Sequence, residues 1–276
     1  MLYHDFVSRI KFCSQNADSL EFSLQKDGKR FLKLADTKLK FAVELPANYI
    51  PDNQFGHKMF ECLELSANHE QISRKSTALD YSVSEYFFQK VSYDDSYVLS
   101  SMDISGTYDN GAYDVSDATR LATRLSYGEN FTKTVTHKEE TYRVPWRRWY
   151  LIMNLNHGLA RTPDCLPANI AVNFRFQRAS AECCYLKISE NLDAVKISDN
   201  SKHSLPVNYT ETVVPIINPR LSAYYAYSPE LESSLSRVTS RNLEISFLGF
   251  NVIKKGIFCI IIFQIITFDD KFWTQV

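Results

Sequence analysis

The sequence predicts an all-β protein whose strands pack as a β-sandwich. Of its 276 residues, 18 are Phe and 16 are Tyr, whereas only 8 are Gly, and this composition favours sheet. The clearest strand lies in Leu166–Ile188, where every second side chain is large and apolar: Ile170, Val172, Phe174 and Phe176. Alternation puts these side chains on one face, which must be buried against another sheet. We expect Gln177–Ser180 to turn this strand into a return strand at Tyr185–Ile188.

The same alternation predicts the other strands. In the second half of Phe31–Leu45 the apolar residues share the inner face, and Pro46–Pro51 ends the strand; these inner residues are Leu39, Phe41, Val43 and Leu45. Shorter segments of β character are Leu20–Leu24, Met59–Leu65, Lys133–His137, Val207–Tyr227 and Glu244–Val252.

The remaining segments show other patterns. Apolar residues at helical spacing predict short amphipathic helices at Thr77–Val91 and Val115–Leu125. Tyr93–Tyr113 is rich in Asp, Ser and Gly and indicates a long loop, Gly128–Glu140 is a second polar stretch, and Ser189–Pro206 resembles a linker.

The composition limits the classes of function. The net charge is −1, so nothing favours wholesale nucleic-acid binding, although a local basic face is open. The segment 1–12 lacks an apolar core, so we expect no signal peptide. The six cysteines form no C-x-x-C pair, which leaves a zinc site unsupported and predicts free thiols in a reducing compartment: Cys13, Cys62, Cys165, Cys183, Cys184 and Cys259.

The sequence carries no enzyme motif. It has no P-loop, no Rossmann glycine pattern and no G-x-S-x-G, and its histidines form no H-x-H pair. We therefore expect no catalytic, cofactor or metal site. The basic and aromatic cluster Trp146–Tyr150 has two interpretations. It can stack on bases and bind phosphate, or it can be a strand edge with tryptophans under arginine stems.

Several segments together resemble the major capsid proteins of Maverick/Polinton elements and their viral relatives, a double jelly-roll family. The resemblance covers roughly residues 15 to 256 and is carried by the order and spacing of packing motifs. These motifs are Ser19–Phe22 with Phe31–Leu39, Asn53–Phe60 with the aromatic stretch Tyr81–Phe88, Leu166–Ile170, Val214–Leu221 and Val252–Gly256. Lys33 and Lys58 stand where the family commonly has Asp and Ser.

The resemblance implies a first jelly roll over residues 1–200, a partial second jelly roll over 201–256, and short helices in the loops between strands. We attribute the apolar tail, 257–276, to an unspliced or mis-assigned exon; its apolar run is too short for a membrane span of about 20 residues. The implied function is structural and non-enzymatic, with self-assembly into homotrimeric capsomers and contacts to other capsid proteins. The implied location is the virion, or otherwise the cell interior.

The resemblance also implies roles for single residues. Tyr224, Tyr225 and Tyr227 suit an interface between copies, although an ordinary strand explains them equally well. Arg147 and Arg148 would face packaged DNA, and no membrane partner is implied.

Two other interpretations stay open. The chain can be a monomeric β-sandwich module that binds carbohydrate or another ligand, with Trp146 and Trp149 as stacking platforms. It can also be a non-functional remnant of an element, because an incomplete second jelly roll leaves sheet edges unpaired.

Overall fold

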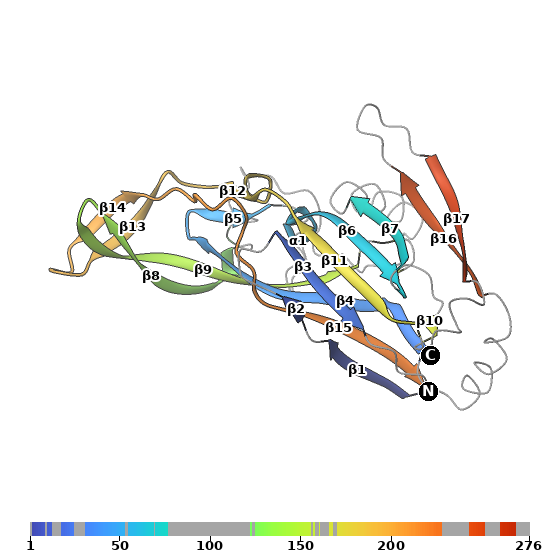
Figure 1. Ribbon diagram of the computed structural model, residues 1–276. Coiled ribbons are helices and arrows are strands. Elements are labelled where there is room, and N and C mark those ends of the chain that lie inside the picture. The colour runs from blue at the N-terminus through green and yellow to red at the C-terminus, as the bar shows by residue number, and fades with distance from the viewer. Residues whose placement is uncertain are drawn as a thin grey trace.

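The structure is a computed structural model dominated by strands (Figure 1). It describes residues 2–8, 10–12, 18–24, 31–52, 55–68, 70–76, 122, 125–155, 157, 160, 166–167, 170–227, 243–251 and 260–268. Two predicted helices, at Thr77–Val91 and over most of Val115–Leu125, lie outside these residues. A short helix does lie between strands, α1 at Phe55–Lys58. No helix in the described part of the chain is long and apolar enough to cross a membrane.

The body of the first sheet has the strand order β1-β15-β4-β9. These strands are Leu2–Ser8 (β1), Ile217–Tyr227 (β15), Phe31–Pro46 (β4) and Glu140–Asn154 (β9). All three pairings are antiparallel. The two-residue strand β10, Leu166–Pro167, pairs with the start of β4.

The second sheet has the order β2-β3-β11-β6-β7. Its strands are Ile10–Phe12 (β2), Ser19–Leu24 (β3), Val172–Arg178 (β11), Phe60–Ala67 (β6) and Glu70–Ser76 (β7). The alternation predicted for the central strand is confirmed, because its large apolar residues are buried and Arg175 is exposed.

The order of the strands is that of a jelly roll. In chain order, the eight principal strands are β1, β3, β4, β6, β7, β9, β11 and β15. The first sheet joins the first, eighth, third and sixth of them, and the second sheet joins the second, seventh, fourth and fifth. Such interlocked Greek keys define a jelly-roll sandwich. The all-β jelly-roll class is therefore confirmed.

One core lies between the two sheets. It is built from the inner faces of both, including Leu39, Val43 and Trp149 from the first sheet and Phe174 from the second. Phe41 of β4 meets Phe60 of β6 edge to face, with ring centroids 6.0 Å apart. Large side chains from facing sheets therefore interdigitate across the sandwich, as sheet packing requires.

The prediction that Tyr185–Ile188 returns as a strand beside β11 is wrong. The chain leaves the sheet through the 3-10 helix Ala181–Cys183, and β12, Tyr185–Lys187, pairs with β5, Tyr49–Pro51. Both edges of β11 are already occupied, by β3 and β6. A hairpin partner therefore has no free edge to join.

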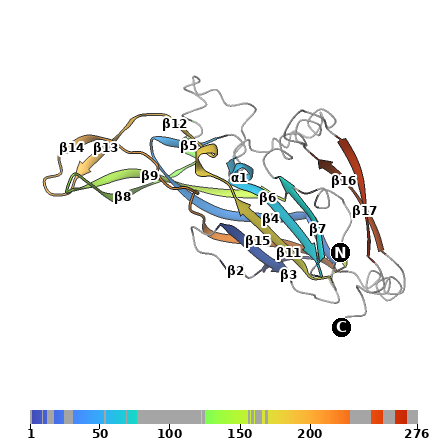
Figure 2. The same ribbon diagram turned by 45° about the horizontal axis from the view of Figure 1, so that its top comes forward.

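The predicted linker Ser189–Pro206 is also wrong, because it forms an antiparallel hairpin. Its strands are β13, Asn191–Lys196, and β14, Lys202–Pro206. β13 pairs with the start of β9, and β8, Glu129–His137, covers the other edge of β9. The four strands form an arm that projects from the sandwich in both views (Figures 1 and 2).

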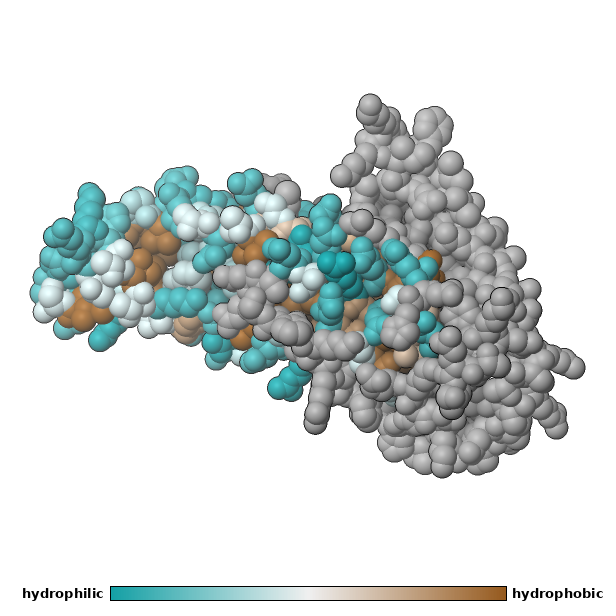
Figure 3. Space-filling model, viewed as in Figure 1, coloured by the Kyte–Doolittle hydropathy of each residue, from teal (hydrophilic) through white to brown (hydrophobic). Residues whose placement is uncertain are grey.

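The arm has a small apolar core of its own. Its buried members are Tyr142, Val144, Leu192, Ala194 and Leu205. The rest of the arm is mostly polar, with apolar patches between polar residues on the face seen in Figure 3. Only three of these residues, Leu192, Ala194 and Leu205, lie in Ser189–Pro206, which explains why that segment resembles a linker.

The last strands bear on the predicted domain organisation. The resemblance assigns Val214–Leu221 to the start of a second jelly roll, whereas β15 lies between β1 and β4 in the first sheet. The sheet thus extends past residue 200 to Tyr227. β16, Leu243–Asn251, and β17, Ile260–Phe268, pair with each other in a separate sheet. Part of the apolar tail is therefore a strand, while its origin stays a hypothesis.

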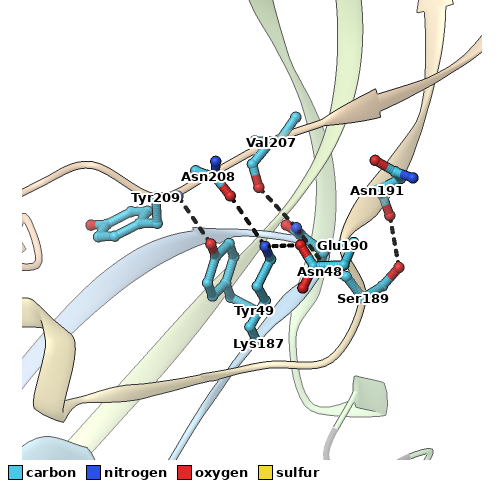
Figure 4. Close-up of polar contacts among 9 residues, drawn as sticks. All are labelled: Asn48, Tyr49, Lys187, Ser189, Glu190, Asn191, Val207, Asn208 and Tyr209. Atoms are coloured by element: carbon cyan, nitrogen blue, oxygen red, sulfur yellow. Dashed lines mark hydrogen bonds and ion pairs between the residues drawn. The ribbon is translucent and has the colours of Figure 1, made fainter.

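A buried asparagine ties the arm to the sandwich (Figure 4). Asn48 is 1% exposed, and its Nδ2 donates hydrogen bonds to the carbonyl oxygens of Ser189, at 3.1 Å, and Val207, at 2.9 Å. Ser189 precedes β13 and Val207 follows β14. One side chain thus holds both ends of the β13–β14 hairpin against the turn after β4.

We expect Asn48→Ala to lower the free energy of unfolding by about 2–3 kcal/mol, because the buried Asn48 amide no longer donates to the Ser189 and Val207 carbonyls. Urea unfolding of the full chain measures this. Asn208→Ala is the control, since the hydrogen bond that the Asn208 side chain accepts from Lys187 is exposed. We expect that variant to stay within about 0.5 kcal/mol of the original chain. Equal effects of the two substitutions would contradict the role of Asn48.

Candidate interaction surface

The outer face of the first sheet is the candidate functional surface. Alternation places Lys38 and Lys40 of β4 on this face, because Leu39 and Phe41 between them are in the core. The strand register then sets cross-strand rows. Lys40 lies opposite Arg220 of β15 on one side and Ile152 of β9 on the other. Neighbouring strands thus bring together residues that are far apart in the sequence.

One end of this face is electrically balanced around Glu44. The Glu44 carboxylate accepts hydrogen bonds from Arg148 Nε at 2.9 Å and Arg148 Nη2 at 2.6 Å, and it pairs with Lys133 Nζ at 2.8 Å. Lys133 Nζ also lies 3.9 Å from the centroid of the Trp146 ring, a cation–π contact. β4, β8 and β9 are thereby joined where the arm leaves the sandwich.

The network shifts the pKa of Glu44. Partial burial acts to raise the pKa of this carboxyl, but the hydrogen bonds and charges of Lys133 and Arg148 outweigh burial. The net result is a pKa below the ordinary value of the group. The pKa of Arg148 is raised, first by its hydrogen bond to Glu44. Both groups are therefore held in their charged forms at neutral pH.

The structure separates the members of the predicted cluster Trp146–Tyr150. Trp149 is fully buried in the core, and Gly128 allows this packing, because a Cβ there would lie 3.0 Å from the Trp149 ring. Arg147 donates to Asn130 Oδ1 and to the Ala47 carbonyl. Trp149 as an exposed stacking platform is therefore wrong, and Trp146 lies under Lys133 rather than under an arginine stem.

Farther from Glu44, the same face carries three cations: Lys38, Lys40 and Arg220. Among the residues whose side chains the structure describes, no ion pair joins Lys38, Lys40 or Arg220 to an acid. Beside them lie two of the exposed large apolar side chains, Tyr150 at 49% and Ile152 at 37% exposure. The Tyr150 hydroxyl donates to Glu129 at 2.9 Å, which fixes the ring on the surface.

The structure also places the tyrosines and two of the cysteines for which the sequence predicted a role or state. Tyr225 is buried in the core at 4% exposure, so its expected interface role is wrong, while Tyr224 lies half-buried on the outer face. The side chain of Tyr227 lies outside the described residues. Cys62 and Cys184 are buried, and neither forms a disulfide with another described residue. The described residues contain no group of three or more His, Cys, Asp or Glu side chains that could hold a metal ion.

The predicted inner face of Leu39 to Leu45 implies that Lys38 and Lys40 point outward, but sequence reasoning missed the site they form. The missing information was the pairing of β15 with β4, which brings Arg220 opposite Lys40. No local signal in the sequence specifies that pairing.

Comparison with known proteins gives similarities among solved structures only. No family model matches the chain, and no curated protein matches it. The capsid protein VP54 of PBCV-1, fitted into a reconstruction of the virophage Sputnik, is similar with a TM-score of 0.46 and 11% identity, over 91% of this chain and 48% of VP54. The Faustovirus major capsid protein is similar with a TM-score of 0.39 and 8% identity, over 91% of this chain and 59% of that protein. The chain thus spans about half the length of the PBCV-1 protein.

We expect Glu44→Gln to lower the free energy of unfolding at pH 7 by about 1–2 kcal/mol, because Lys133 and Arg148 lose their common anion. The folded pKa of Glu44 is lowered, so this stability is complete above the unfolded pKa of about 4.3 and is lost as the pH falls through the folded value. The difference between Glu44→Gln and the original chain must therefore shrink below about pH 4.

Urea unfolding at a series of pH values from 7 to 3 measures that difference. Glu139→Gln is the control, since Glu139 is exposed in the β8–β9 turn. It is expected to change stability little at any pH. A Glu44→Gln effect that stays constant down to pH 3 would show that charge pairing is not its cause.

Proposed function

We propose that this chain is a self-associating structural subunit of a capsid-type shell and that it has no catalytic role. One observation carries the proposal: the outer face of the first sheet exposes Tyr150 and Ile152 next to Lys38, Lys40 and Arg220. Exposed aromatic and apolar groups beside arginine are typical of surfaces that bind other proteins. Jelly rolls build shells by burying such surfaces between identical copies.

We further propose that the chain forms a homotrimer. This trimer assembles, alone or with other capsid proteins, into a virion. The motif resemblance supports kinship with Maverick/Polinton capsid proteins. It also supports a first jelly roll followed by a partial second one, with the first extended to include β15. Arg147 and Arg148 are held by Asn130, Ala47 and Glu44, so the proposal gives them no role in binding DNA.

The alternative is a monomeric ligand-binding module, because jelly rolls also form lectins and cupins. The two tryptophans predicted as stacking platforms for a ligand give this alternative little support. Trp149 is buried, and the Trp146 ring is covered by Lys133. Oligomeric state separates this alternative from the capsid-type subunit.

Light scattering after size exclusion of the full chain tests the proposal. We expect a mass of about 96 kDa, three copies of the 31.9 kDa chain, or larger assemblies. We further expect Ile152→Asn to weaken association about ten-fold, because an apolar anchor leaves the interface.

Ile197→Asn is the matched control. Ile197 is 38% exposed, against 37% for Ile152, but it lies on the arm. A monomer at every concentration would overturn the proposed function. Equal effects of the two substitutions would place the interface elsewhere.

A further inference from the structure

Lys38, Lys40 and Arg220 lie in two adjacent rows of the outer face, and none of them forms an ion pair with an acid whose side chain the structure describes. Lys40 is directly opposite Arg220, and Lys38 lies two residues along the same strand, opposite Ser222. Like charges directly opposite each other on a sheet destabilise it. The contrast with Glu44 is informative, because there one acid serves two cations on the same face. The Lys38–Lys40–Arg220 cluster therefore has the character of a surface that an acidic partner neutralises.

The chain itself contains a segment of matching chemistry. Between Lys90 and Arg120 the sequence has six aspartates and no lysine, arginine or glutamate: Asp94, Asp95, Asp103, Asp109, Asp114 and Asp117. This is the longest part of the chain without a basic residue. Four tyrosines interleave with the aspartates, at positions 93, 97, 108 and 113. Aspartates neutralise lysine and arginine, and tyrosines can cover exposed apolar groups such as Ile152.

We infer that the acidic segment 92–119 of one copy docks on the Lys38–Lys40–Arg220 face of a neighbouring copy. The inference rests on the proposed self-association and specifies how it occurs. The contact is head to tail, because a segment meets a different surface of its neighbour, and such contacts close into rings when the rotation permits. Charge complementarity sets the register, and burial of Tyr150 and Ile152 adds apolar contact.

Charge reversal tests the docking. We expect Lys38→Glu with Lys40→Glu to weaken self-association of the full chain at least about ten-fold, since attraction becomes repulsion. Asp94→Lys with Asp95→Lys is expected to do the same. The matched control is Lys138→Glu with Lys202→Glu, two exposed lysines of the arm, which is expected to leave association unchanged. Circular dichroism verifies that each variant is folded.

Mixing the two reversed variants shows whether the docked segment comes from a neighbouring copy or from the same chain. A mixture of the two reversed variants restores complementary charges at every contact between unlike chains, so we expect mixed complexes by native mass spectrometry where neither variant associates alone. Restoration only when all four substitutions are in one chain would overturn the inference, because the segment would then bind its own face.

Two further outcomes distinguish failure of the docking inference from failure of the proposed function. Undiminished association of the Lys38→Glu, Lys40→Glu variant would overturn the docking while the proposed function stands. A monomeric original chain would overturn the proposed function itself.

Discussion

The pairing of β15 with β4 determines both the core between the sheets and the cations on the outer face. β15 comes late in the chain, yet it fills the position between β1 and β4 and closes the first sheet. It contributes Leu221 and Ala223 to the core and places Arg220 beside Lys40 on the outer face. Closing so long a loop costs chain entropy, and the burial of one continuous core between two sheets opposes that cost. The cationic surface is therefore a consequence of the same long-range strand pairing that completes the first sheet.

The arm and the sandwich are joined by polar groups at two places. Asn48 holds the ends of the β13–β14 hairpin, and Glu44 connects β4 to β8 and β9 through Lys133 and Arg148. A small core such as that of the arm contributes little stability alone. Directional contacts at its base thus fix the position of the arm relative to the outer face.

The sequence predicts the fold well where burial follows a strict period of two. Val172, Phe174 and Phe176 alternate over a whole strand, and Leu39 to Leu45 do the same, so both strands were predicted with their inner faces. Prediction failed where a strand buries few apolar residues and where the strand partner comes from a distant segment. Leu192, Ala194 and Leu205 are too few to mark a hairpin, and Tyr185 pairs with Pro51 because β11 has no free edge. The charged surface was predictable only in part, since Lys38 and Lys40 alternate visibly but their proximity to Arg220 depends on long-range register.

Lysine reactivity measures whether the outer face of the first sheet is buried between copies. The full chain would be acetylated briefly at a concentration where it is monomeric and at one where it is assembled, with mass spectrometry reporting each site. We expect Lys38 and Lys40 to become protected on assembly, while Lys138 and Lys202 of the arm react equally in both states. Equal reactivity of Lys38 and Lys40 in the two states would contradict this burial.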